Sequence, residues 1–530
     1  MRRTVVWYAF LGAALTQAAA GQTGTRLWRP DERVVLRYFD DVRQVAATNA
    51  GVFAVTAGGL TVYDARFNNW LPPVTELDGF PTDRATVVLG DPADESLWIG
   101  MRDAVVHYMP VLRQFDRIPI LDGVRQLMFD EADPYRGLYV LTSREWVLIP
   151  RGGLLASPAL DLPPAERHVV SATVGDVLAR YPAADALRAQ VLVDHARRYR
   201  YTSATIDPMN RMAFFGTDGR GILRFDAAVG RLDPLPFGLL SSGVGALELG
   251  DGGVWVGTTP DTHGGYRFRT GFTWITEDFQ QTRRERGPGM NGFRFGHARD
   301  IMMWEGQRWA ATDAGLVRFG GGSAQVIDRN SGLPSSDAYV LAVTTAGLWV
   351  GTARGVALVQ DGGEAVEWIA AIGAGGVINA MVSQGDSLWV GGPSGLLLLP
   401  AGTFEVIVPA NEWVQPFLLE SVMALTTSGA RVVMALAERI IWRGEDGQWK
   451  LERPLSEVGL ITALAGDSAG VWIGGQAGVQ FFRFETGDHV AVAGPGDLPG
   501  VVRALAVSQG FVWIGTDGGL VRIRKDAILP

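Results

Sequence analysis

A short pattern of apolar residues recurs along the chain at a nearly constant interval. The pattern is an apolar residue, a tryptophan, a second apolar residue and a glycine, and clear copies occupy residues 97–100, 254–257, 348–351, 388–391, 471–474 and 512–515. In weaker copies another residue replaces the tryptophan or the glycine, and these copies are centred on Phe53, Tyr139, Phe214, Trp309 and Val433. Most successive copies lie about 41 residues apart, so the chain repeats one structural unit.

Each copy continues as a β-hairpin. Residues 516–523 read Thr-Asp-Gly-Gly-Leu-Val-Arg-Ile, and residues 312–319 read Thr-Asp-Ala-Gly-Leu-Val-Arg-Phe. The glycine before the second apolar run suits a turn position that needs a positive φ. Another apolar run precedes each clear hairpin and a looser one follows it, so one repeat supplies four strands. Four strands of five or six residues with short loops use about 41 residues, which is one blade of a β-propeller.

The repeat therefore predicts an all-β fold of about eleven four-stranded propeller blades, with the tryptophans filling the gaps between blades. We expect two tandem propellers of about five and six blades, over residues 21–270 and 271–530, with the seam near residues 270–300. One oversized ring is the alternative. The last unit has three strands, and residues 33–38 are expected to supply the fourth, because pairing the two chain ends removes two exposed sheet edges.

Two intervals between copies are longer than the rest and indicate insertions. In the first, residues 164–198, the apolar spacing predicts two short helices divided at Tyr181 and Pro182. We expect this insertion to be a cap over a channel mouth, a docking surface or a packed decoration without a partner. Both insertions are expected in connections from an outer strand to the next inner strand, so both would rise from the same face of the protein.

Residues 1–20 are predicted to be a signal peptide. Arg2 and Arg3 give a basic start, residues 5–15 form an apolar stretch too short to span a bilayer, and residues 18–20 are alanines suited to cleavage. We therefore expect a periplasmic or secreted chain without an integral membrane segment after cleavage; an uncleaved N-terminal anchor is the alternative. The chain has no cysteine, which excludes disulfides and thiolate metal sites. Its net charge of −9 argues against a nucleic-acid partner.

Loops that precede the first strand of several repeats carry a family resemblance. Residues 330–337 read Asn-Ser-Gly-Leu-Pro-Ser-Ser-Asp, and similar loops occupy residues 78–83 and 496–500. Together with the Leu-Trp-Ile-Gly-Thr hairpins they resemble the two-component regulator propeller repeat. That family is found in the periplasmic sensor regions of hybrid histidine kinases and in secreted or surface relatives. The resemblance implies a sensor-type propeller, here without a kinase domain after the last blade.

The second insertion interleaves arginines with aromatic residues. Such side chains can hold an anionic group or a peptide through bidentate and stacking contacts, and pairing of the arginines with nearby acids is the alternative. The residues expected to bind a ligand or partner are Arg283, Arg284, Arg286, Phe293, Arg294 and Phe295, with Asp337 from the loop at residues 330–337.

Three aspartates, Asp218, Asp313 and Asp517, recur at one turn position, where we expect each side chain to cap its own turn. The histidines show no metal-ligand spacing, and no cofactor motif or catalytic motif is present in the sequence. We therefore expect no cofactor and no metal. The function expected is non-catalytic recognition of a peptide, glycan or envelope protein on the loop face. The alternative is a propeller enzyme that acts on a polysaccharide as a lyase or glycosidase.

Overall fold

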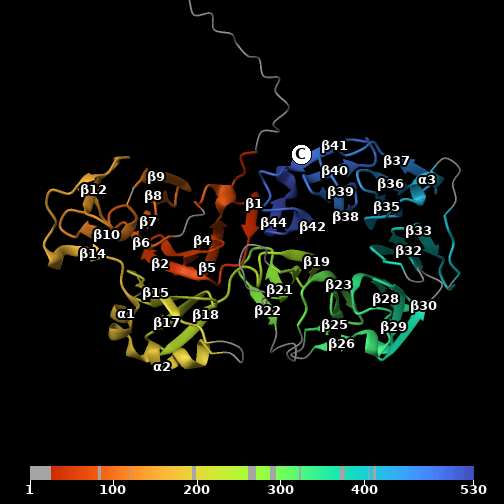
Figure 1. Ribbon diagram of the computed structural model, residues 1–530, viewed down its shortest axis with the longest axis horizontal. Coiled ribbons are helices and arrows are strands. Elements are labelled where there is room, and N and C mark those ends of the chain that lie inside the picture. Colours follow the sequence, from red (N-terminus) through yellow and green to blue (C-terminus); the bar gives the residue numbers. More distant parts are fainter. Residues whose placement is uncertain are drawn as a thin grey trace, which may run out of the picture.

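The computed structural model describes residues 26–81, 85–120, 122–193, 198–209, 211–260, 270–286, 294–320, 324–369, 376–403, 405–409 and 414–529. The expected signal peptide lies outside these residues. The described chain forms eleven antiparallel sheets, as the repeat predicts. Nine of them have four strands, one has five and one has three. The fold is therefore all-β, with sheets arranged as propeller blades (Figure 1).

Four sheets come from the N-terminal part of the chain. Their strands are β2 (Val42–Thr48), β3 (Gly51–Thr56), β4 (Gly59–Asp64) and β5 (Asn69–Val74); β6 (Val87–Gly90), β7 (Leu97–Gly100), β8 (Ala104–Met109) and β9 (Gln114–Pro119); β10 (Val124–Asp130), β11 (Gly137–Thr142), β12 (Trp146–Pro150), β13 (Ser157–Pro158) and β14 (His168–Val170); and β15 (Tyr201–Ile206), β16 (Ala213–Thr217), β17 (Ile222–Asp226) and β18 (Arg231–Leu235).

Seven sheets follow. Their strands are β19 (Val244–Gly250), β20 (Gly253–Thr258), β21 (Gly271–Thr276) and β22 (Thr282–Arg286); β23 (Ala298–Trp304), β24 (Gln307–Thr312), β25 (Gly315–Phe319) and β26 (Gln325–Ile327); β27 (Ala338–Thr344), β28 (Gly347–Thr352), β29 (Gly355–Gln360) and β30 (Ala365–Ile369); β31 (Ala380–Gln384), β32 (Ser387–Gly392) and β33 (Gly395–Leu399); β34 (Ala424–Ser428), β35 (Arg431–Ala435), β36 (Ile440–Arg443) and β37 (Trp449–Leu451); β38 (Ile461–Asp467), β39 (Gly470–Gly475), β40 (Gly478–Arg483) and β41 (His489–Ala493); and β42 (Val502–Val507), β43 (Phe511–Thr516), β44 (Gly519–Arg524) and β1 (Arg33–Leu36).

Contacts between the inner strands divide the sheets into two groups. Strand β6 contacts β2 and β10, and β2 contacts β15, which makes a four-bladed unit. In the second group each inner strand from β19 to β42 contacts the next, and β42 contacts β19, which closes a seven-bladed ring. The division is thus four and seven blades rather than the expected five and six. The boundary between the two groups falls between β18 and β19. The expected boundary at residue 270 lies inside one sheet, because β20 pairs with β21 across it.

The N-terminal strand completes the last blade of the ring. Strand β1 pairs antiparallel with β44, with Arg33 opposite Ile523 and Leu36 opposite Leu520. Figure 1 shows this red strand beside the blue C-terminal sheet. Trp513 of the same blade packs among Val244 and Val254 of the first blade of the ring. Strand pairing and tryptophan packing therefore close the seven-bladed ring together.

The marker tryptophans lie between blades, as expected. Each of them stands on the second strand of its sheet and is nearly or fully buried against the sheet that follows; they are Trp98, Trp255, Trp309, Trp349, Trp389, Trp472 and Trp513. A large flat side chain fills the gap that widens between neighbouring blades toward the rim.

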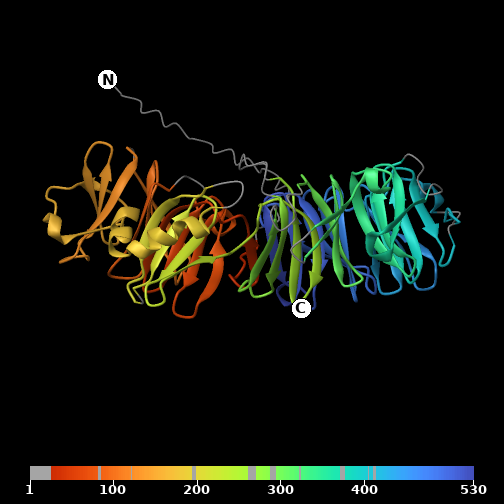
Figure 2. The same cartoon turned by 90° about the horizontal axis from the view of Figure 1, so that it is seen from below.

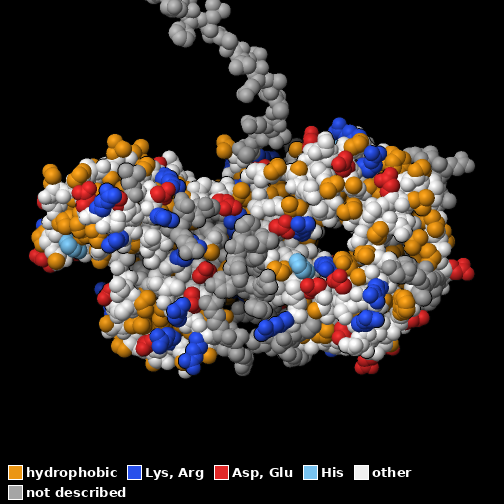
Figure 3. Space-filling view, viewed as in Figure 1, with side chains coloured by type: hydrophobic (Ala, Val, Ile, Leu, Met, Phe, Trp, Pro, Cys, Tyr) orange, Lys and Arg blue, Asp and Glu red, His pale blue; other side chains and the backbone are white. Residues whose placement is uncertain are grey.

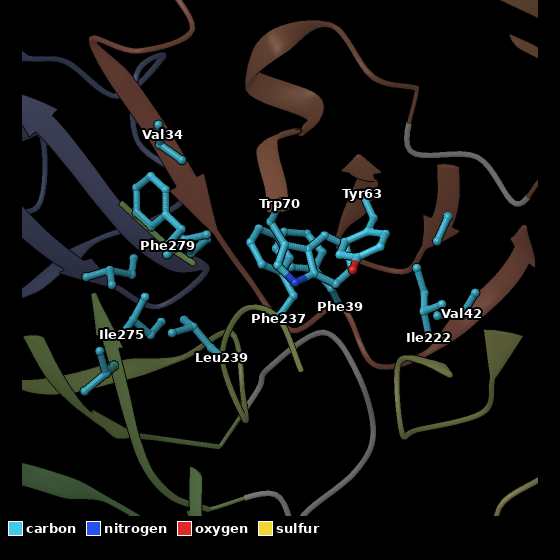
Figure 4. Close-up of a cluster of buried hydrophobic side chains, with 14 of the residues drawn as sticks. Val34, Phe39, Val42, Tyr63, Trp70, Ile222, Phe237, Leu239, Ile275 and Phe279 are labelled. Carbon is cyan, nitrogen blue, oxygen red and sulfur yellow. The ribbon is translucent and has the colours of Figure 1, made fainter. Parts of the chain in front are cut away.

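The four-bladed unit is an insertion between β1 and the rest of the ring. Tyr38, where the chain leaves the ring, forms a β-bridge with Gly238, where it returns. Beside this crossing the ring of Phe237 stacks on Phe39 at 5.6 Å and on Trp70 at 4.4 Å between centroids. Figure 4 shows these rings in one cluster with Leu239 and Ile275. One apolar core thus joins the two units, which lie side by side in Figure 2.

The first insertion forms the two expected helices, α1 (Val174–Arg180) and α2 (Pro182–Val191). Their apolar residues Val177, Ala184 and Leu192 pack on Phe215 and Leu223 of the sheet β15–β18. The opposite face of this sheet packs on the sheet β2–β5. The insertion is therefore packed against the side of a blade. A third helix, α3 (Gln415–Leu418), follows the three-stranded sheet.

The second insertion differs from the expectation. The extra residues are shared between the connection from β20 to β21, residues 259–270, and the connection from β22 to β23, residues 287–297. Only the latter joins an outer strand to an inner one. The interval between two marker tryptophans shows that a repeat is lengthened but not which of its turns is longer. The sequence-based prediction therefore assigned all the extra residues to one connection.

The blades share one orientation, which gives the molecule two distinct faces. One face carries the outer-to-inner connections and the turns between second and third strands, and we call it the loop face. There Thr86 Oγ1 donates to Val124 O at 2.8 Å and Thr202 Oγ1 donates to Val42 O at 2.7 Å, which joins the starts of neighbouring inner strands. We call the opposite face the turn face; it has the turns from first to second and from third to fourth strands.

Candidate functional site

The loop-face end of the seven-bladed ring is framed by one residue from each blade. In most inner strands the pairing register shifts after the first residue, which leaves the second residue in a β-bulge. The bulged residues, and the residues that take the same place directly before β31 and β34, are Gly245, Arg299, Tyr339, Asn379, Met423, Thr462 and Arg503.

Several of these side chains hold neighbouring blades together. Arg299 Nη1 donates to Ala338 O at 3.0 Å, Asn379 Nδ2 to Val422 O at 3.3 Å and Thr462 Oγ1 to Val502 O at 2.6 Å. Each acceptor is a carbonyl oxygen at or just before the start of the next inner strand. We call the loop-face opening of the seven-bladed ring the mouth. Hydrogen bonds from blade to blade surround it and fix the positions of the side chains that remain partly exposed.

One polar cluster at this mouth includes a residue that the sequence predicted. Asp337 forms an ion pair with Arg299 and accepts a hydrogen bond from the hydroxyl of Tyr339 at 3.0 Å. The Arg299 guanidinium lies 4.0 Å from the centroid of the Tyr339 ring. Burial, assisted by the bond to Asp337, raises the pKa of Tyr339 above its usual value. About a quarter of the Arg299 side chain, 26%, and 37% of the Asp337 side chain remain exposed.

A second charged pair lies on the last blade. Arg503 donates from Nε and Nη2 to the two oxygens of Asp517, at 2.7 and 2.9 Å. This bidentate bond raises the pKa of the guanidinium. The blade between Arg503 and Arg299 has a glycine, Gly245, as its bulged residue, and the side chain of Thr259 lies against it. Figure 3 shows a hollow in the middle of the seven-bladed ring with basic and acidic side chains beside it.

The recurring turn aspartates do not cap their own turns. Asp218 Oδ1 accepts from the backbone amide of Arg200 at 2.8 Å, and Asp313 Oδ1 accepts from that of Gly296 at 2.7 Å, so each ties its turn to the preceding outer-to-inner connection. The threonine before each aspartate caps the turn instead: Thr312 Oγ1 donates to Gly315 O, and Thr516 Oγ1 to Gly519 O. The short aspartate side chain reaches the facing loop because the two loops lie side by side on the loop face.

The predicted arginine cluster is not gathered on one surface. Arg284 is mostly buried at the junction of the two units, where Nη1 lies 2.6 Å from Asp40 Oδ2 and Nη2 donates to Phe237 O and Gly238 O. Phe295 is buried against Phe272, with ring centroids 5.2 Å apart. Arg283 is exposed and lies near Glu285. Arg294 is exposed on the loop face. Phe293 and the side chain of Arg286 lie outside the described residues.

Two largely buried carboxyl groups were not singled out in the sequence. Burial raises the pKa of Asp300 to about 7, although its oxygens accept hydrogen bonds from the amides of Leu341 at 2.7 Å and Ile301 at 2.9 Å. Burial also raises the pKa of Glu248, which accepts from the amide of Met303. Both therefore bridge adjacent inner strands and serve the blade contacts. A carboxylate within a strand of alternating apolar residues was the only sequence signal for them.

The described residues contain no group of three or more histidine or acidic side chains arranged to hold a metal ion. Within the same ranges, no helix has both the length and the apolar character needed to cross a bilayer.

No family model matches the chain, and no curated protein matches it. Among solved structures, the extracellular domain of the one-component system BT4673 from B. thetaiotaomicron is similar over 92% of this chain and 70% of that one, at 15% identity and a TM-score of 0.43. PorZ, a surface component of the type-IX secretion system of Porphyromonas gingivalis, is similar over 91% of this chain and 68% of that one, at 13% identity and a TM-score of 0.45.

Virginiamycin B lyase from Staphylococcus aureus is similar over 53% of this chain and 95% of that one, at 9% identity and a TM-score of 0.43. Likenesses of this strength leave the architecture to be judged from the chain's own sheets. Membership of the two-component regulator propeller repeat family stays a prediction.

Proposed function

We propose that this chain is an exported, non-catalytic recognition protein of the bacterial envelope, and that its seven-bladed ring binds a partner at the loop-face mouth. The observation that carries the proposal is the cluster of Arg299, Asp337 and Tyr339, which comes from two neighbouring blades and is partly exposed. Each of these residues stands on or beside a strand that is hydrogen-bonded in its sheet and tied to the next blade. Polar groups held in this way on a rigid scaffold are typical of binding sites.

The chemistry of the mouth favours a partner with carboxylate groups. A guanidinium has five N–H donors, and Arg299 and Arg503 each use two toward the residues named above. The other N–H groups of each guanidinium have no acceptor among the described residues and can donate to an anion in the fixed fork geometry of arginine. The planar pair of Arg299 over Tyr339 offers a stacking surface for a sugar ring or a planar peptide group. An acidic peptide and a uronate-containing glycan are the two sources of such carboxylates.

Arrays of acidic peptides and of uronate oligosaccharides, probed with the mature chain, test the proposal and separate the two sources. Arg503→Gln should weaken the affinity for a bound probe about tenfold, since a charge-assisted hydrogen bond contributes about 1.5–3 kcal/mol. Arg117→Gln is the matched control, because Arg117 has the same 46% side-chain exposure and also pairs with an aspartate, Asp103, in the four-bladed unit. Absence of binding on both arrays, or equal loss in the two variants, would contradict the proposal.

The alternative of a polysaccharide-cleaving propeller needs a free acid and base beside the substrate. The carboxylates of Asp337 and Asp517, described above, each accept hydrogen bonds from an arginine instead. Release of reducing ends or unsaturated sugars from acidic polysaccharides would favour the enzyme, and binding without release favours recognition.

A further inference from the structure

The most exposed large apolar side chains gather on the turn face. Among the described residues eight such side chains are at least 65% exposed, and seven of them lie on this face; Leu160, which follows β13, is the eighth. Six of the seven are in turns of the four-bladed unit: Phe67, Val111, Leu112, Tyr135, Leu155 and Val229. Scattered single apolar residues are ordinary on a protein surface, but concentration on one face of one unit is not.

The distribution follows the repeat. Phe67 lies between β4 and β5, Val111 and Leu112 between β8 and β9, Leu155 between β12 and β13, and Val229 between β17 and β18. Every blade of the four-bladed unit thus presents an apolar side chain at its turn from third to fourth strand. Because all four blades share one orientation, these turns project from the same face.

Hydrogen bonds fix the tips that carry these residues. Asp64 Oδ1 accepts from the amides of Arg66 at 2.9 Å and Phe67 at 3.4 Å. Asp226 Oδ1 accepts from the amides of Ala228 at 2.9 Å and Val229 at 3.4 Å. An aspartate that caps the turn in this way holds the apolar side chain outward as part of a defined structure.

The seven-bladed ring supplies an internal comparison. Two of its corresponding turns have a similar cap: Asp278 Oδ1 accepts from the amide of Gln280 and Asp446 Oδ1 from that of Gln448, both at 3.0 Å and both two residues after the aspartate. The residues three positions after these aspartates are Gln281, which is exposed, and Trp449, which is buried, so neither turn exposes an apolar side chain at that position. The turn itself therefore does not require an apolar residue, and the apolar tips of the four-bladed unit need another explanation.

The arrangement of these apolar side chains and the position of the N-terminal segment favour a lipid bilayer as the partner of this surface. Side chains that project singly from four turns suit a fluid layer that closes around each of them, as in interfacial membrane binding. The described chain begins on the same face: Arg26 donates to Ala527 O beside the end of β44, and Leu27 is 95% exposed. In the alternative in which residues 1–20 are not cleaved, the apolar run at residues 5–15 would anchor the chain just before this point and bring the turn face to the bilayer.

The charged residues near the apolar side chains indicate which lipids the binding experiment needs. Several arginines near these tips are paired with acids, Arg66 with Asp64, Arg151 with Asp91 and Asp94, and Arg231 with Asp233. Arg113, beside Leu112, instead donates to the carbonyl oxygens of Pro72 and Pro73. Most of the positive charge on this surface is therefore matched by acids, and attraction would rest mainly on burial of the apolar tips. We propose that the turn face of the four-bladed unit docks on an electrically neutral bilayer surface through Phe67, Val111, Leu112, Leu155 and Val229.

Flotation of the mature full-length chain with phosphatidylcholine–phosphatidylethanolamine vesicles, at low and high salt, tests this proposal. Binding should be nearly independent of salt, because it does not depend on ion pairing. The variant Phe67→Ser/Val111→Ser/Leu112→Ser/Val229→Ser should lower the partition coefficient at least about tenfold, since each tip loses apolar area. The control variant Trp368→Ser/Ile407→Ser/Leu419→Ser removes apolar residues of the seven-bladed ring that are about half exposed, and it should bind vesicles like the original chain.

Circular dichroism and the melting temperature establish that both variants are folded. Failure of the original chain to float with neutral vesicles, or equal loss in both variants, would overturn the proposal. Sedimentation velocity without lipid distinguishes a second occupant. Should the turn variant abolish a dimer while vesicle binding is absent, the face is an interface between copies of this chain and the lipid proposal is wrong. Ligand binding at the loop-face mouth is a separate measurement, so the two proposals can fail independently.

Discussion

Arg284 and Asp40 form an ion pair across the junction of the two units, with Nη1 2.6 Å from Oδ2. Their side chains are only 14% and 4% exposed, and Arg284 also donates to the carbonyl oxygens of Phe237 and Gly238. The pair therefore connects an outer strand of the seven-bladed ring to both segments that lead into and out of the four-bladed unit.

Removal of the acid from this pair should loosen the junction. Asp40→Asn leaves a buried guanidinium without its counter-ion, and loss of one partner of a buried ion pair costs about 3–5 kcal/mol. We expect a lower midpoint in urea and faster amide exchange around Phe237. Arg283→Gln, on the neighbouring exposed residue, should change stability by less than about 0.5 kcal/mol. Equal effects of the two substitutions would show that the Arg284 contact does not hold the units together.

Two marker tryptophans should respond differently to the same substitution. Trp472 Nε1 donates to Asp467 Oδ2 at 3.1 Å, whereas Trp513 Nε1, also buried, has no acceptor among the described residues. Trp513→Phe removes an unsatisfied donor, and Trp472→Phe removes a hydrogen bond, so the second substitution should cost about 1 kcal/mol more. Trp513→Ala should cost about 3–5 kcal/mol, because it opens a cavity where the ring closes. Urea denaturation measures all three values.

The buried carboxyl of Asp300 predicts a pH dependence of stability. Burial raises its pKa to about 7, against 3.8 for the unperturbed group, and nearby Glu248 raises it further. The folded state therefore keeps a proton that the unfolded state releases. This contribution to stability is complete below about pH 4 and is lost as the pH rises through about 7.

The variant Asp300→Asn should remove this component while leaving an oxygen to accept from the Leu341 amide. The melting temperature of the original chain minus that of the variant should fall between pH 4.5 and 8. A difference that stays constant over this range would mean that Asp300 is ionised in the folded protein at all these pH values.

The helical insertion should depend on its packing against one blade. Val177 is fully buried against the sheet β15–β18. Val177→Asp places a charge in that contact, so α1 and α2 should become sensitive to protease and exchange their amides faster. Blades of the seven-bladed ring should keep their protection. Loss of protection throughout the chain would indicate that the helices support both units.

The hairpins were predictable because their evidence is local: the tryptophan, the glycine and the apolar run of each hairpin lie within about ten residues of each other, and strand pairing follows from their order. The division into four and seven blades is not local. Only a short connection joins β18 to β19, so the chain gives no gap in spacing where the units separate. The contact of β2 with β15 depends on which sheet faces pack together, and spacing contains no information about that.

The candidate site shows the same limit. Arg284 looked like a surface residue in a basic segment, yet its partner Asp40 lies 244 residues away in sequence. Asp337 was recognised from its loop, whereas Arg299 and Tyr339 were missed because a bulge position is defined by the pairing of two strands. The turn aspartates were found at the right turn, but their acceptor role is set by a facing loop.

The pairing of the two chain ends is the central claim, and a disulfide between β1 and β44 tests it most directly. The chain contains no cysteine, and Val35 lies opposite Val521 in the register, so Val35→Cys/Val521→Cys creates one possible bond. Mass spectrometry of the oxidised protein should find this bond within one chain, with a melting temperature at or above that of the reduced form. Absence of the bond under oxidation, or formation of the bond only between chains, would contradict closure of the seven-bladed ring by the N-terminal strand.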